Sequence, residues 1–146
     1  ILTHAVPDSF LFASGKAYFQ KSLESYLNKI RKPLVQKTMT VWKEHNYKNV
    51  ELRIEGHTDP NGIRSGTVRG SDESFLQNLD LSSQRANNVY HYIFNTPSLS
   101  EEEKEFVKKN MISVGYSFSR RVRDNDVADT QKDAMSRRIE FRIISK

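Results

Sequence analysis

Strict alternation of apolar and polar residues marks three segments of the chain as strands, and it constrains the fold more than any other feature. The alternation covers residues 50–55, 112–116 and 139–143. A period of two turns one side of each strand toward a core and the other toward polar surroundings. A fourth, shorter strand is predicted over residues 8–15 (DSFLFASG), where phenylalanines alternate with smaller residues ahead of a Ser-Gly pair.

Helical periodicity fills the segments between these strands. Apolar residues recur every three or four positions from Leu23 to Trp42. Pro33 is expected to kink this helix or to open a second one, because proline has no amide donor. A second helix is predicted from about residue 81 to 94. A short third helix is predicted within residues 98–110, where a serine and a glutamate have the spacing of a capping box.

The order strand, helix, strand, helix, strand, strand predicts an α/β fold. Two helices can cover one face of a four-stranded mixed sheet, which gives a two-layer sandwich with βαβαββ order. The 146 residues suit one domain with a single core, so residues 1–146 are predicted to form one domain. Residues 63–77 and 117–133 show no periodicity and are predicted to be loops.

Composition narrows the classes of partner. The chain has no cysteine, which excludes disulfides and thiolate metal sites. Its net charge of +5 favours anionic partners. It has no run of apolar residues long enough to span a bilayer and no recognisable signal peptide. Because residue 1 is isoleucine, we expect a fragment of a longer protein whose anchor or export signal lies upstream.

Several polar residues near the predicted strand and helix ends are candidates for a site, although each has a plainer interpretation. Asp59 follows a strand, where it could form an Asx turn or a cap. Ser82 could be the N-cap of the second helix. Asn78, Ser82 and Arg85 would share one face if that helix began earlier. Arg85 in a first helical turn would lie where the dipole disfavours a cation, so it would need an anion, either a ligand or an acidic side chain.

Four segments together resemble a known family. They are residues 54–62 (IEGHTDPNG), 78–86 (NLDLSSQRA) and 136–143 (SRRIEFRI), with an opening Phe-x-x-x-x-Gly at residues 10–15. Their order and content are similar to those of OmpA-like C-terminal peptidoglycan-binding domains, a family that includes Pal and the wall-anchoring part of MotB. The resemblance spans nearly the whole chain.

This resemblance implies a non-catalytic domain that binds the meso-diaminopimelate of the peptidoglycan stem peptide and anchors a membrane protein to the cell wall. It implies a periplasmic location, with the parent protein in the inner or outer membrane. No cofactor, metal or nucleic acid is expected, and a homodimer is left open. The implied ligand-gripping pair is Asp59 and Arg85. The implied supporting residues are Thr58, Asn78, Leu81, Ser82, Arg137 and Arg138.

The sequence also departs from the family pattern around the expected site. Fifteen residues separate Gly62 from Asn78, where the family has about four, and residues 95–110 are also enlarged. Ser136 replaces an asparagine, and Lys132-Asp133 replaces a Gly-Arg pair. The rim of the site is therefore expected to differ from that of its relatives.

Three alternatives stay open at this point. A stator subunit of an ion-driven motor, similar to MotB, would keep the fold and change the biological role. The basic residues 120–123 would suit a nucleic-acid binder, but no aromatic residues are interleaved with them. A metal enzyme could use His57-x-Asp59 with another histidine. The candidates for that histidine are His4, His45 and His91.

Overall fold

The computed structural model describes residues 2–7, 12, 15–17, 20–121 and 129–145. Its strands are β1 (Leu2–Pro7), β2 (Val50–His57), β3 (Met111–Gly115) and β4 (Arg138–Ser145). Its helices are α2 (Lys21–Glu44), α3 (Asp72–Phe94), α4 (Glu101–Asn110) and α5 (Asp129–Ser136). The strands form one sheet in the order β1-β4-β2-β3, in which β4 runs antiparallel to both neighbours and β2 runs parallel to β3.

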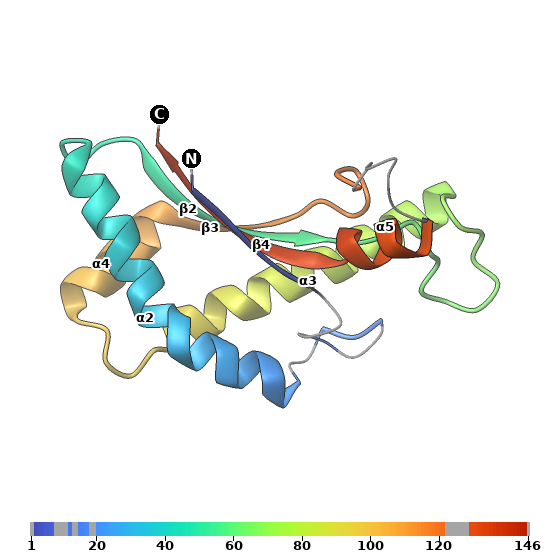
Figure 1. Cartoon of the computed structure of the whole chain (residues 1–146), viewed down its shortest axis with the longest axis horizontal. Helices are drawn as coiled ribbons and strands as arrows, with labels where there is room; N and C mark the ends of the chain where they lie inside the picture. Colours follow the sequence, from blue (N-terminus) through green and yellow to red (C-terminus); the bar gives the residue numbers. More distant parts are fainter. Residues whose placement is uncertain (1, 8–11, 13–14, 18–19, 122–128, 146) are drawn as a thin grey trace.

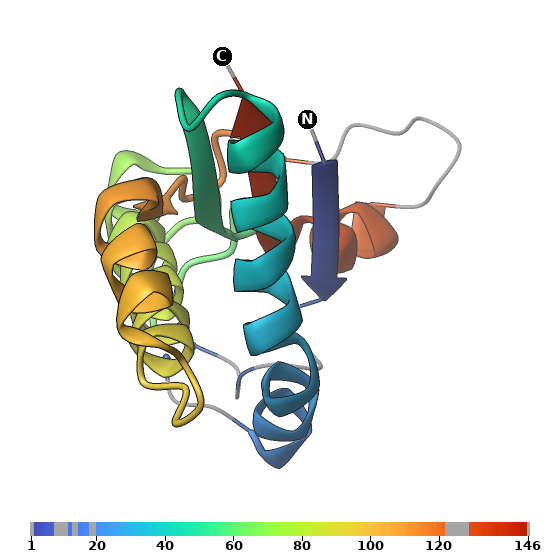
Figure 2. The same cartoon turned by 90° about the vertical axis from the view of Figure 1, so that its left-hand side faces the viewer.

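The core lies between the sheet and the helices α2, α3 and α4, which lie on one face of it (Figures 1 and 2). The alternating apolar residues of β2 and β4 point into this core, as predicted. The most deeply buried apolar side chains of β2, β4, α2 and α3 are Leu52, Ile54, Ile139, Leu23, Leu27, Val35, Ala86, Val89 and Ile93. The predicted fold class, a mixed four-stranded sheet with helices on one face, is confirmed.

The long helix and the enlarged 95–110 segment both contribute to this core. Pro33 lies inside α2 and does not open a second helix. The predicted capping box of α4 is present, because Ser100 and Glu103 each accept a hydrogen bond from the other's backbone N–H. Phe106 of α4 is buried, with its ring centroid 5.0 Å from that of Trp42. No helix among the described residues is both long and apolar enough to cross a membrane.

The first strand was predicted in the wrong place. β1 occupies Leu2–Pro7, ahead of the predicted segment 8–15, of which only Phe12 and Gly15 fall within the described residues. β1 is an edge strand that pairs with β4 alone. His4 and Ala5 are exposed, so the strand has little of the apolar alternation by which buried strands are recognised.

The second helix begins nine residues earlier than predicted, at Asp72 instead of Leu81. Ser71 caps it by accepting a hydrogen bond from the Ser74 backbone N–H. The added turns bury Ser74 and Asn78, which are polar, so no apolar period reveals them. Ser82 is therefore not an N-cap, and Arg85 lies well inside the helix. The expectation that a helix dipole calls for an anion at Arg85 was wrong.

Two glycines let α3 lie directly on the sheet. A Cβ atom on Gly56 of β2 would lie 2.2 Å from the backbone oxygen of Ser82. A Cβ atom on Gly115 of β3 would lie 2.5 Å from the backbone nitrogen of Ser83. This close approach brings the middle of α3 against the carboxyl ends of β2 and β3.

The segment 117–133 was predicted to be a loop, but its end is helical, since α5 starts at Asp129. Its residues 122–128 lie outside the described part of the chain. Figure 1 shows α5 at the same end of the molecule as the long loop that precedes α3. That end of the sheet carries the candidate site.

Candidate functional site

A cavity of about 590 Å³ lies where β2 ends and α3 passes over it. Six of the eight predicted site residues line it: Thr58, Asp59, Asn78, Leu81, Arg85 and Arg137. They come from the end of β2, from α3 and from the turn between α5 and β4. The structure therefore brings together side chains that lie up to 79 residues apart in the sequence.

The carboxylate of Asp59 lies in the wall of this cavity. Its side chain is 6% exposed. One oxygen, Oδ1, accepts a hydrogen bond of 2.9 Å from the backbone N–H of Asn61, which is the contact of an Asx turn. The other oxygen, Oδ2, forms an ion pair with Nη1 of Arg137. Asp59 can therefore form the Asx turn and also belong to a binding site. The turn holds Oδ1, and Oδ2 can still interact with charged groups.

Arg85 enters the cavity from α3. It is buried, its Nε donates to the backbone oxygen of Lys16 at 2.8 Å, and its guanidinium carbon lies 4.7 Å from the centroid of the Phe12 ring. Stacking and hydrogen bonding together restrict a planar guanidinium to one orientation. The cavity therefore contains a carboxylate and two arginines, a net positive charge.

Asn78 and Thr58 complete the polar wall. Asn78 Nδ2 donates to the backbone oxygens of Asn61 and Ser74, both at 2.9 Å. The Thr58 backbone N–H donates to Ser117 at 2.9 Å, whereas its Oγ1 is buried and has no hydrogen-bond partner among the described residues. Such a group in a cavity wall is normally satisfied by water or by a ligand.

Ser82 and Arg138 do not line the cavity. Ser82 Oγ accepts from the Ser117 backbone N–H at 3.0 Å and so fastens α3 to the segment after β3. Arg138 pairs with Glu140 at 2.7 Å and donates to the backbone oxygen of Arg120 at 3.1 Å. Both residues stabilise the surroundings of the cavity in this structure.

Several residues of the cavity wall were not predicted. Residues 60–71, called the inserted loop below although residues 60–62 belong to the motif 54–62, contribute three of them. The side-chain oxygen of Gln77 accepts from the backbone N–H groups of Ile63 and Arg64, and the Gly70 N–H donates to the Pro60 oxygen. These contacts shape the start of the inserted loop and close its ends. The unpredicted lining residues are Phe12, Gly15, Gln20, Asn61, Gly62 and Ile63.

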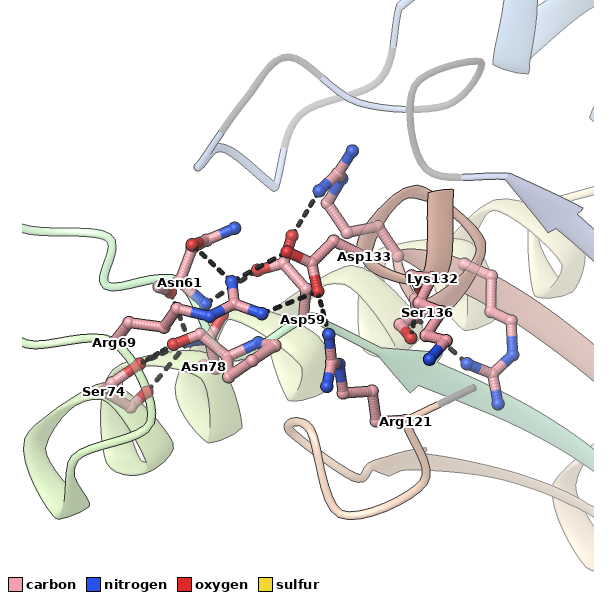
Figure 3. A network of polar contacts seen from close by, with 12 residues as sticks. Asp59, Asn61, Arg69, Ser74, Asn78, Arg121, Lys132, Asp133 and Ser136 are labelled. Carbon is pink, nitrogen blue, oxygen red and sulfur yellow. Dashed lines mark hydrogen bonds and ion pairs between the residues drawn. The ribbon is translucent and has the colours of Figure 1, made fainter. Parts of the chain in front are cut away.

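An ion-pair cluster links the inserted loop to α5 (Figure 3). Asp133 receives Arg69 at 2.7 Å and Arg121 at 2.8 Å. The hydrogen bond from Arg69 lowers the pKa of Asp133 below its ordinary value, against the effect of burial, and Arg121 lowers it further. Asp133, which belongs to the Lys132-Asp133 pair that replaces the family's Gly-Arg, thus pairs with Arg69 of the inserted loop.

The structure places three possible metal ligands close together, but they are not the set that the metal-enzyme alternative needs. Glu55, His57 and Glu140 offer ligand atoms within 4.8 Å of one another, without Asp59. However, Glu55 lies 3.6 Å from Arg53 and 3.5 Å from Arg142, and Glu140 pairs with an arginine as well. These guanidinium groups already neutralise the carboxylates, so the cluster suits an ion-pair network on the sheet better than a cation site.

We expect this network to make the folded state sensitive to acid. Burial alone would raise the pKa of Glu55, but the hydrogen bond from His57 and the charges of Arg142 and Arg53 outweigh it and lower the pKa. A lowered folded pKa means that the stabilisation is complete above the ordinary value of 4.5 and is lost as the pH falls through the folded value.

We therefore expect the free energy of unfolding, measured by urea titration, to fall as the pH is lowered from 5 toward 3. Glu55→Gln should be less stable at neutral pH and show a shallower fall, because one titrating carboxylate is gone. Parallel pH profiles for the two proteins would contradict a role of Glu55 in this dependence.

Comparison with known proteins gives a consistent result. The OmpA family model matches residues 11–135. Protein YtxE of Bacillus subtilis is 28% identical over 134 residues, which are 92% of this chain and 44% of that protein. The chain thus spans less than half of this relative.

Solved structures share the fold. A MotB-like protein of Desulfovibrio vulgaris matches with a TM-score of 0.66 at 19% identity, over 99% of this chain and 73% of that one. The cell wall anchor of the Pseudomonas aeruginosa type VI secretion system matches with a TM-score of 0.61 at 20% identity, over 99% and 81%. The peptidoglycan-associated lipoprotein of Burkholderia pseudomallei matches with a TM-score of 0.50 at 18% identity, over 92% and 88%.

The family model covers most of the chain, including β2, α3 and the cavity residues between them. The solved structures extend the agreement to the whole fold. The chain therefore belongs to the OmpA family, whose domains are non-catalytic and bind peptidoglycan.

Proposed function

We propose that this domain binds the peptide stem of peptidoglycan through meso-diaminopimelate and so anchors a larger envelope protein to the cell wall. The observation that carries the proposal is the cavity itself, in which the carboxylate of Asp59 and the guanidinium groups of Arg85 and Arg137 line one space of about 590 Å³. The prediction of a non-enzymatic domain is confirmed at the level of the family.

The free end of diaminopimelate carries an ammonium and a carboxylate on one carbon. A carboxylate such as Asp59 only accepts hydrogen bonds and can take the ammonium, while a guanidinium presents a rigid fork of donors to the carboxylate. In this proposal the ligand ammonium shares the Asp59 carboxylate with Arg137, and Arg85 binds the ligand carboxylate. Each charge-assisted bond contributes roughly 1.5–3 kcal/mol.

The similar proteins support the wider role. One is described as a cell wall anchor, one as a peptidoglycan-associated lipoprotein, and several as MotB periplasmic domains. We accordingly place this domain in the periplasm, on a parent protein held in the inner or outer membrane. A stator subunit of an ion-driven motor is the second candidate for that parent, favoured by the TM-score of 0.66 with the MotB-like protein.

Ligand choice tests the mechanism. A stem peptide with lysine in place of diaminopimelate keeps the ammonium and lacks the side-chain carboxylate, so the proposed bond from Arg85 to the ligand would be lost. We expect calorimetric titration to give about ten- to hundredfold weaker binding for the lysine peptide, the loss of one charge-assisted bond. Amidation of the same carboxylate should weaken binding to a similar extent.

The salt dependence provides the control for this comparison. If binding came from the net charge of +5 alone, it would weaken steeply with salt for all peptides alike. A preference for diaminopimelate that persists at two salt concentrations supports the proposal. Equal affinities for the two peptides would show that no arginine of the cavity binds the side-chain carboxylate of diaminopimelate.

A further inference from the structure

We propose that the inserted loop contributes to ligand binding by holding the Asp59 carboxylate in position. Arg69, which does not line the cavity, is the positioning residue. The inference rests on the proposed function for its ligand, and on the contacts of the described residues for its geometry. It assigns a role to a loop that is longer here than in the family pattern.

The guanidinium of Arg69 joins two parts of the chain. Nη1 donates to Asn61 Oδ1 at 2.7 Å and to Asp133 Oδ2 at 2.7 Å, and Nη2 donates to Asp133 Oδ1 at 2.9 Å. Figure 3 shows Arg69 between these two residues. An isolated surface ion pair stabilises little, but this pair is bidentate and Asp133 is only 13% exposed.

Each of the two residues that Arg69 holds leads to one oxygen of Asp59. The backbone N–H of Asn61 donates to Oδ1 at 2.9 Å. On the other side, the backbone oxygen of Asp133 accepts from the N–H of Arg137 at 3.1 Å, and Arg137 pairs with Oδ2. Arg69 therefore closes a ring of contacts that passes through Asn61, Asp59, Arg137 and Asp133.

The ring fixes the orientation of the carboxylate that the proposed ligand needs. Without Arg69, the Asn61 side chain and the last turn of α5 each lose a partner, so both donors to Asp59 can move. The ligand would then have to order them on binding, which lowers affinity without the loss of any direct contact. The same loss should follow when the other end of the pair, Asp133, is changed.

The experiment compares Arg69→Ala, Arg69→Lys and the control Arg64→Ala by calorimetric titration with a diaminopimelate stem peptide. Arg64 lies in the same loop with the same charge, and its side chain is exposed and outside the cavity wall. We expect about three- to tenfold weaker binding for Arg69→Ala, a partial loss for Arg69→Lys, which keeps the charge without the fork, and no change for Arg64→Ala.

A double-mutant cycle tests the pairing. Asp133→Asn should weaken binding to a similar extent, and its combination with Arg69→Ala should weaken binding little further. Fully additive effects, or an Arg69→Ala protein that binds like the wild type, would overturn the positioning role.

A measurement without ligand separates this inference from the proposed function. Amide hydrogen exchange at Arg137, whose N–H is bonded to Asp133, should become faster in Arg69→Ala and stay unchanged in Arg64→Ala. If wild-type protein fails to bind the peptide, the proposed function falls while the exchange rates still decide the role of Arg69. Unchanged exchange in Arg69→Ala would sink the positioning role even if the peptide binds.

Discussion

Asp59→Asn should weaken the binding of a diaminopimelate stem peptide by more than about 30-fold, which corresponds to about 2 kcal/mol. Asparagine keeps the shape of the side chain and can keep the hydrogen bond from the Asn61 N–H to Oδ1. It loses the negative charge, so the ligand ammonium and Arg137 would both face a neutral amide. The measurement is calorimetric titration, together with co-sedimentation of the protein with purified sacculi.

Asp80→Asn is the matched control, because Asp80 is exposed on α3 and does not line the cavity. It should bind like the wild type. Alanine is not a suitable substitution for Arg85, because it would also remove the packing over Phe12 and the hydrogen bond to Lys16. Arg85→Lys keeps a cation without the fork and should weaken binding to an extent comparable with Asp59→Asn. Wild-type affinity in both variants would remove Asp59 and Arg85 from the site.

Most elements with a clear apolar period could be predicted from the sequence. In β3, however, the predicted apolar face is not the buried one, because Met111 is buried and Ile112 is exposed. β2, β4 and α4 follow their predicted segments closely, because each buries one apolar face against the core. β1 and the first turns of α3 escaped prediction for a physical reason. β1 is an edge strand in which His4 and Ala5 are exposed, and the start of α3 buries serine and asparagine, which carry no periodic apolar signal. Ser71 followed by two acidic residues was the signal that could have located the start of α3.

The same division applies to the site. The motif residues are adjacent to predicted strand and helix ends, so a shared location could be predicted, and six of the eight meet in one cavity. The link between the inserted loop and α5 could not be predicted, because it is made by the pairing of Arg69 with Asp133, 64 residues away. Nothing in the local sequence of either residue indicates that partner. Ser82 and Arg138 are close in sequence to residues that line the cavity, but their side chains bond to partners outside it.

Gly56→Ala should be strongly destabilising, because Gly56 is the residue of β2 on which α3 lies directly. The added Cβ would lie 2.2 Å from the backbone oxygen of Ser82 and 2.9 Å from its carbonyl carbon, and backbone atoms cannot turn aside as a flexible side chain can. We expect a loss of about 3 kcal/mol or more in the free energy of unfolding, measured by urea titration, at the upper end of the usual effect of overpacking.

Gly70→Ala separates this steric effect from the effect of backbone conformation. Gly70 has a positive φ of 74° and no atom within 4 Å of an added Cβ, so alanine there meets strain without a clash, with an expected loss of about 1 kcal/mol. Gly56 has the opposite combination. Any folded Gly56→Ala protein must also move α3 away from the end of β2, which separates Arg85 from Asp59 and should weaken peptide binding. If Gly56→Ala were no less stable than Gly70→Ala, then the close contact of α3 with the sheet would not be what holds the two halves of the site together.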